Sequence, residues 1–210
     1  MCMSENNMIN KKKIGIMGGT FNPIHVGHLL MAQWAKESAD LDEILFIPTG
    51  NPYMKAGSGV LDGSVRLEMV QLSIDKEESF SCSDIEIKRS GNTYTYETLQ
   101  ELKEIYPDAE LYFIVGADSL YSFERWVHPE SILENCVLMA AARNGAKMDE
   151  LDGKRKELIK RFGGEIRLFD FPAIDVSSTM VRNRVAEGKS IRYLVTDQVC
   201  DYIKANGLYL

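Results

Sequence analysis

Two histidines, His25 and His28, stand three residues apart near the start of the chain, with Gly27 between them. A helical pattern opens after Pro23, and a spacing of three places both imidazoles on one face of that helix. A helix start carries free N–H groups and the positive end of the helix dipole, which attract phosphate. Imidazole N–H groups can donate to phosphate oxygens and stabilise charge as pyrophosphate departs. A histidine pair at a helix start is therefore a candidate phosphate-binding site.

A glycine turn precedes this helical pattern. Residues 14–17 form an apolar run typical of a buried strand, and Gly18 and Gly19 end it. Because glycine has no side chain, a phosphate or a flat base can approach the backbone there and at Gly27. An isolated histidine pair at this spacing is more often merely solvated. The succession of strand, glycine turn, helix start and paired histidines instead predicts a nucleotide triphosphate site.

A second helix start carries hydroxyl groups at Ser177, Ser178 and Thr179, with Arg182 one turn further along. Hydroxyls at this position cap a helix and offer donors to phosphate. Taken alone, the segment is better explained as an ordinary N-cap followed by an exposed arginine.

Lys55 follows a loop shaped by prolines and glycine, and it could reach a phosphate when that loop closes. On composition alone it would be an ordinary surface lysine. Residues 50–63 contain four glycines, which predicts a mobile loop beside the phosphate site.

Three further residues have chemistry suited to a second substrate. Asp118 follows an apolar run, residues 111–115, and could accept hydrogen bonds from ribose hydroxyls or from water bound to Mg²⁺. Trp126 could stack on a positively charged aromatic ring, although a core tryptophan is an equally good explanation. Backbone amides near Thr95 open a helical pattern and could bind a carboxylate.

The elements that must position these residues alternate along the chain. Strand-like runs are expected at residues 14–17, 44–47, 83–87, 111–115, 137–141 and 166–169. Helical patterns are expected at residues 25–39, 65–74, 95–106, 151–162, 178–187 and 196–205. This predicts an α/β fold, a Rossmann-like doubly wound parallel sheet with helices on both faces and a small C-terminal helical extension. The candidate residues follow strands, where such sheets bind ligands.

Length and composition suit one domain over residues 13–210, preceded by a flexible tail, residues 1–12, that does not resemble a secretory signal. The net charge of −7 argues against binding nucleic acid. No apolar run approaches the roughly 20 residues of a membrane span. The four cysteines are scattered without metal-like spacing, which predicts reduced thiols in a cytoplasmic protein.

The Gly-Gly-Thr-Phe turn with His-x-Gly-His, and the later Ser-Ser-Thr-x-x-Arg, resemble motifs of the nucleotidylyltransferase superfamily. Residues 48–55 and 116–126, with Thr95, are similar to those of bacterial nicotinate-nucleotide adenylyltransferases, and the resemblance spans nearly the whole chain. Asn22 stands where many relatives have Asp, and Val127 where an aromatic residue is common.

The resemblance implies roles for particular residues. The catalytic group would be His25, His28, Lys55 and Arg182, which would hold the triphosphate of ATP. The ATP-binding residues would be Gly18, Gly19, Thr20, Phe21, Gly27, Ser177, Ser178 and Thr179. The residues that bind nicotinate mononucleotide would be Asn51, Thr95, Asp118 and Trp126. Mg²⁺ would enter with ATP and bridge phosphate oxygens, without direct protein ligands.

The implied reaction is an in-line attack of the mononucleotide 5′-phosphate on the α-phosphorus of ATP. It gives deamido-NAD and pyrophosphate in NAD biosynthesis. Because the nucleophile is already an anion, no general base is required, and catalysis consists of positioning and charge stabilisation.

Other functions are also open from the sequence. Phosphopantetheine adenylyltransferases and cytidylyltransferases for glycerol phosphate or choline phosphate share parts of these motifs. Class I aminoacyl-tRNA synthetases also carry His-x-Gly-His, but they need a Lys-Met-Ser-Lys-Ser-like loop and a tRNA-binding domain, and neither is expected in this acidic chain of 210 residues. A non-enzymatic nucleotide sensor on the same fold is a further alternative. Nicotinamide mononucleotide as co-substrate and assembly into a homo-oligomer are left open as well.

Overall fold

The computed structural model describes residues 11–50, 59–143 and 148–210. Its sheet is wholly parallel, in the order β3-β2-β1-β4-β5-β6. The strands are β1 (Lys13–Gly19), β2 (Glu43–Pro48), β3 (Phe80–Cys82), β4 (Glu110–Gly116), β5 (Val137–Arg143) and β6 (Ile166–Phe171). This confirms the doubly wound α/β fold. The chain winds outwards from β1 in one direction and from β4 in the other, which creates a switch point between them.

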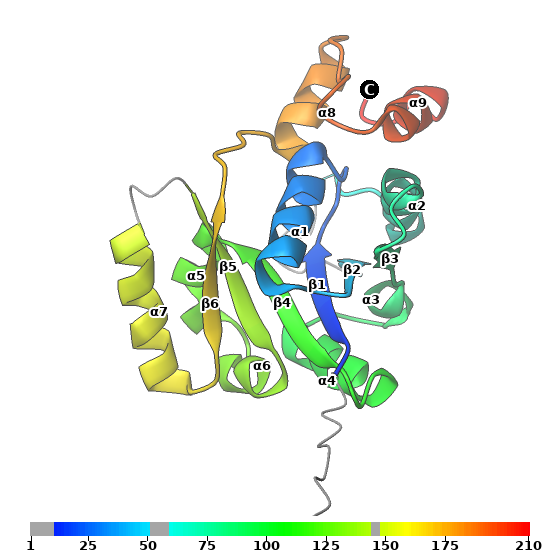
Figure 1. The fold of residues 1–210 in the computed structure, drawn as a ribbon. Helices are drawn as coiled ribbons and strands as arrows, with labels where there is room; N and C mark the ends of the chain where they lie inside the picture. Colours follow the sequence, from blue (N-terminus) through cyan, green and yellow to red (C-terminus); the bar gives the residue numbers. More distant parts are fainter. Residues whose placement is uncertain (1–10, 51–58, 144–147) are drawn as a thin grey trace, which may run out of the picture.

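Helices cover both faces of this sheet (Figure 1). One face carries α1 (Val26–Ala39), α2 (Gly63–Ile74), α8 (Ser178–Ala186) and α9 (Asp197–Ala205). The other carries α3 (Ile85–Lys88), α4 (Thr95–Ile105), α5 (Ala117–Ser122), the 3₁₀ turn η2 (Phe123–Arg125), α6 (Pro129–Asn135) and α7 (Met148–Phe162). The pair α8 and α9 forms the expected C-terminal extension.

Strand residues alternate between two hydrophobic cores. In β4, Tyr112 and Ile114 pack under α1, whereas Leu111, Phe113 and Val115 pack under the opposite layer. Successive strand side chains point to opposite faces, so a strand buried on both sides reads as a continuous apolar run. The central strands were therefore predictable from short runs of isoleucine, leucine and valine.

The expected strand at residues 83–87 is wrong. The edge strand β3 ends at Cys82, and α3 begins at Ile85. The main-chain N–H of Ile85 donates to the Ser83 hydroxyl at 3.3 Å, a local contact that turns the chain into a helix. Polar and apolar residues alternate over this segment, a pattern that is also typical of a strand. In the structure β3 is an edge strand that pairs with one neighbour, β2.

Other boundaries agree closely, since His25 precedes α1 as its N-cap and Thr196 precedes α9 as its N-cap. The short helices α5 and α6 were not expected. Most of the predicted tail and most of the predicted 50–63 loop lie outside the described residues. No helix in the described part of the chain is long and apolar enough to cross a membrane.

Candidate active site

A cavity of about 550 Å³ lies where β1 leads into α1 and where α8 begins. Both helices present their N-terminal ends to it. Its described lining residues are Thr20, Asn22, His25, Gly27, His28, Met31, Val60, Phe171, Ile174, Val176, Ser177, Ser178, Thr179 and Arg182. None of them is Asp or Glu, although the chain carries a net charge of −7. The donors of this cavity suit an anionic ligand.

The two histidine rings stack in this cavity. Their centroids are 3.7 Å apart and their planes differ by 22°. The main-chain N–H of His25 donates to Nδ1 of His28 at 3.2 Å, so a neutral His28 carries its proton on Nε2. The edge contact with Phe21, at 5.0 Å between ring centroids, further fixes the orientation of His28.

His25 is buried, and its Nδ1 atom has no hydrogen-bond partner among the described residues. Burial lowers the pKa of His25 to about 4, which makes its ring neutral at physiological pH. A Cβ atom at Gly27 would lie 3.1 Å from this Nδ1. Glycine at position 27 therefore makes room for the His25 ring as well as for a ligand.

The start of α8 is tied to the approach to α1. The Ser177 hydroxyl accepts from the N–H of Met180 at 3.2 Å and caps the helix. The Ser178 hydroxyl donates to the Pro23 carbonyl at 2.8 Å. Arg182 donates to the Asn22 carbonyl at 2.8 Å, so the guanidinium is fixed at the edge of the cavity.

Arg66 in α2 is a buried residue beside this site that the sequence reasoning missed. Its guanidinium is 1% exposed and donates to four main-chain carbonyls, those of Thr20, Thr49, Gly50 and Leu61, at 2.7 to 3.1 Å. It thereby joins the turn after β1 to the loop after β2. An arginine among apolar helix residues gives no sequence signal for such a role.

Asn22 was also missed as a site residue. It is 3% exposed, and its Nδ2 donates to the Gly59 carbonyl at 3.3 Å. Its Oδ1 accepts from the N–H of Leu61 at 3.3 Å and from the hydroxyl of Tyr209 at 2.9 Å. The amide therefore connects the turn after β1 to the residues before α2 and to the C-terminus.

A second cavity, of about 440 Å³, lies between the start of α4 and the segment after β4. Its described lining residues are Thr93, Tyr94, Thr95, Ser119, Ser122, Arg125, Trp126, Val127 and Ile132. Trp126 lies against Phe123 and Phe113, with ring-centroid distances of 5.5 and 6.1 Å. Its indole therefore packs against core residues and also lines the cavity. Arg125 is the one charged residue among these lining residues and was not predicted.

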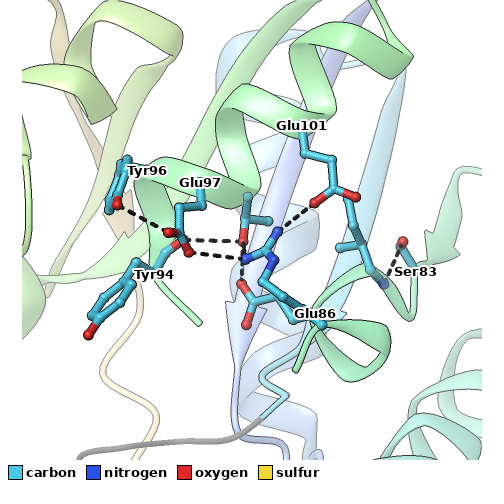
Figure 2. A network of polar contacts seen from close by, with 9 residues as sticks. Ser83, Glu86, Tyr94, Tyr96, Glu97 and Glu101 are labelled. Atoms are coloured by element: carbon cyan, nitrogen blue, oxygen red, sulfur yellow. Dashed lines mark hydrogen bonds and ion pairs between the residues drawn. The ribbon is translucent and has the colours of Figure 1, made fainter. Parts of the chain in front are cut away.

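A polar network that is buried at Glu86 and Thr98 and partly exposed at Glu97 and Glu101 holds the start of α4 (Figure 2). The Thr98 hydroxyl donates to the Glu86 carboxylate at 2.9 Å, and Arg89 pairs with Glu101 at 2.6 Å and Glu97 at 3.8 Å. Burial raises the pKa of Glu86, while donation from Thr98 opposes that shift. The network fixes α4 against α3 and so positions the Thr95 end of the second cavity.

Several expected site residues do not line either cavity. Gly18 and Gly19 end β1, and Phe21 packs in the core beneath His28 with a left-handed φ of 47°. Asp118 is exposed in the first turn of α5. Asn51 and Lys55 lie outside the described residues.

Known proteins match most of the length of this chain. Residues 16–184 match the family described as cytidylyltransferase-like. A probable nicotinate-nucleotide adenylyltransferase from Lachnoclostridium phytofermentans is 45% identical over 199 residues, 95% of this chain and 100% of that protein. One from Dehalococcoides mccartyi is 47% identical over 201 residues, 94% of this chain and 97% of that protein.

Among solved structures, the chain is similar to Plasmodium falciparum nicotinic acid mononucleotide adenylyltransferase complexed with NaAD. The TM-score is 0.76 at 23% identity, and the match covers 94% of this chain and 97% of that one. At this identity the likeness shows a shared fold.

Proposed function

Because this chain belongs to the nicotinate-nucleotide adenylyltransferases of the cytidylyltransferase-like family, we propose that its two cavities bind the two substrates of that reaction. ATP occupies the cavity between α1 and α8, and nicotinate mononucleotide occupies the cavity at the start of α4. The products are deamido-NAD and pyrophosphate. The observation that carries this proposal is the stacked pair of histidines, with His25 buried and neutral, in a cavity without described carboxylates.

The reaction on this proposal is direct transfer. The mononucleotide phosphate attacks the α-phosphorus of ATP, and the bond to the β-phosphate oxygen breaks as pyrophosphate leaves. The attacking oxygen carries its own negative charge, so the protein has no proton to remove. Its contribution is to hold both substrates in line and to stabilise the charge on the transferring phosphoryl group.

The residues at the helix starts have the donors for this task. The Nε2–H of His28 donates to a phosphate oxygen, and Arg182 offsets negative charge on the triphosphate. Ser177, Ser178 and Thr179 line the same end of the cavity. Lys55, expected to reach the triphosphate as well, lies outside the described residues.

The donor set also bears on the metal ion. Hydroxyls, imidazoles and a guanidinium suit phosphate oxygens, whereas Mg²⁺ prefers oxygen ligands and keeps several waters. We infer that Mg²⁺ arrives bound to ATP, where it neutralises phosphate charge. The residues around it hold the nucleotide rather than the ion.

The second cavity offers a ring and a cation to the mononucleotide. Trp126 stacks on the pyridinium, which gains cation–π attraction. The carboxylate meets the free N–H groups at the start of α4, near Thr95. Arg125 supplies a positive charge at the same cavity.

We place this reaction in the cytoplasm. Cys82, Cys136 and Cys200 carry free thiols, and burial raises the pKa of the Cys136 thiol to about 12. Thiols of this kind suit a reducing compartment.

The test is product formation with different acceptors. The protein should form deamido-NAD and pyrophosphate from ATP, Mg²⁺ and nicotinate mononucleotide, identified by mass spectrometry. Phosphopantetheine with ATP, and glycerol phosphate with CTP, should give no product. Product from either rival pair, with none from nicotinate mononucleotide, would overturn the proposal.

A further inference from the structure

The last residues of the chain turn back toward the ATP cavity. After α9, the N–H of Leu208 donates to the Ile203 carbonyl at 3.0 Å, and Gly207 has a left-handed φ of 59°. These contacts form the helix-ending turn in which a glycine reverses the chain direction. The turn delivers Tyr209 to Asn22, which lies 187 residues earlier in the sequence.

The Tyr209 hydroxyl is a dependable donor in this position. It lies 2.9 Å from Oδ1 of Asn22. Burial raises the pKa of Tyr209, although the Arg182 and Arg66 guanidinium groups nearby act in the opposite direction. The hydroxyl therefore keeps its proton at neutral pH and points it at the amide oxygen.

That contact settles which way the Asn22 amide faces. Oδ1 accepts from Tyr209 and from the N–H of Leu61, so Nδ2 is directed to the Gly59 carbonyl. The main-chain carbonyl of Asn22 accepts from Arg182. Asn22, a buried residue that lines the ATP cavity, is thus hydrogen-bonded to the C-terminal segment, to α8 and to the residues before α2.

We propose that Tyr209 is a positioning residue for ATP, which acts from the C-terminal segment through its hydrogen bond to Asn22. The proposal rests on the proposed function, because it takes ATP as the occupant of this cavity. Tyr209 does not line the cavity itself, so it acts on the substrate only through Asn22.

The docking of α9 does not depend on this hydroxyl. Val199 and Ile203 of α9 are buried in the core. Tyr202, also in α9, donates to Glu68 Oε2 of α2 at 2.8 Å, on the surface and outside the cavity lining. Among the described residues, the hydroxyls of Tyr202 and Tyr209 both attach the C-terminal segment, and that of Tyr209 contacts a residue that lines the cavity.

The experiment compares Tyr209→Phe with the matched control Tyr202→Phe, each of which loses one hydroxyl. Loss of one hydrogen bond to Asn22 should raise KM for ATP roughly five-fold in Tyr209→Phe. KM for the mononucleotide should change by less than about two-fold, since the second cavity is untouched. Tyr202→Phe should keep both KM values and kcat.

Two results would overturn the proposal: an unchanged KM for ATP in Tyr209→Phe, or the same kinetic change in both variants. Equilibrium binding of ATP with Mg²⁺, measured by calorimetry, separates this proposal from the proposed function. If the wild type releases no pyrophosphate with nicotinate mononucleotide, the proposed function fails. Weaker ATP binding by Tyr209→Phe alone would still support the positioning role, and equal binding by all three proteins would end it.

Discussion

Burial decides the protonation state of His25 and with it the character of the histidine pair. The ring is 7% exposed, and its pKa falls to about 4. A neutral ring can lie 3.7 Å from that of His28 without the repulsion that two imidazolium ions would suffer. The pair consequently acts through hydrogen bonds rather than as a pair of fixed cations.

This shift makes stability depend on pH. An unfolded His25 binds a proton below about pH 6.5, whereas the folded protein does not bind it until about pH 4. The stability contributed by a neutral His25 is thus complete above the unfolded pKa and is lost as pH falls toward the folded pKa. The loss across this window amounts to about 3 kcal/mol at most.

Urea unfolding of the wild type and His25→Gln across this pH range measures the effect. The wild type should lose more stability than the variant as the pH is lowered. His128→Gln, a change at a histidine whose side chain is 58% exposed, should track the wild type. If the difference in free energy of unfolding between the wild type and His25→Gln did not vary with pH, the lowered pKa of His25 would be contradicted.

His28 is expected to contribute to turnover more than to mononucleotide binding. On the proposed function, its Nε2–H donates to the charge that develops on phosphate, so His28→Ala should lower kcat about 100-fold or more. KM for nicotinate mononucleotide should stay within about three-fold, since that substrate binds the other cavity. Steady-state kinetics beside His128→Ala provide the check, and near-normal turnover of His28→Ala would refute this role.

At residue scale, the sequence singled out candidate side chains that stand in motifs and gave no sign of those whose contacts are far apart in the chain. His25, His28 and Arg182 were predicted from motifs at two helix starts, and the structure places all three in the lining of one cavity. Asn22 and Tyr209 are in contact although 187 positions separate them in the sequence, and no local sequence pattern predicts such a contact.

At the scale of elements, α2 holds two loops beside the ATP cavity, although no residue of α2 is among the described residues that line it. Arg66 donates to carbonyls in the turn after β1 and on the loop after β2. In the described structure it has no carboxylate partner within ion-pair distance, so main-chain oxygens alone solvate the buried charge.

Replacing this arginine should be costly. Arg66→Leu strands buried carbonyl groups and should lower the free energy of unfolding by about 3 kcal/mol or more. Arg66→Lys keeps the charge but has fewer donors, so it should fall between that variant and the wild type. Arg161→Leu, at a side chain that is 59% exposed, should cost less than about 0.5 kcal/mol. Equal urea midpoints for Arg66→Leu and Arg161→Leu would show that the buried contacts add nothing.

The helices and strands differ in how well they can be predicted from the sequence. Strands buried on both faces have continuous apolar runs, and helices such as α8 and α9 have clear N-caps in Ser177 and Thr196. The edge strand β3 has three residues and the helix α3 has four, too few to establish either period. Their placement depends on contacts with β2 and on the Glu86 network, which only the folded chain brings together.

At the scale of the whole molecule, an acidic protein presents two cavities without described carboxylates at the carboxyl edge of its sheet. The overall charge of −7 disfavours nucleic acid, while the helix starts and a few cations create local sites for small anions. One cavity suits a triphosphate, and the other offers a ring, a cation and helix N–H groups. Together they account for a reaction between two phosphorylated nucleotides.

Selection of the acid over the amide form of the mononucleotide tests this account most directly. The measurement is the rate of pyrophosphate release with ATP and Mg²⁺, comparing nicotinate mononucleotide with nicotinamide mononucleotide. Capture of the carboxylate near Thr95 and Arg125 predicts a kcat/KM for the acid that is about 100-fold higher or more. Equal rates for the two, or faster release with the amide, would contradict it.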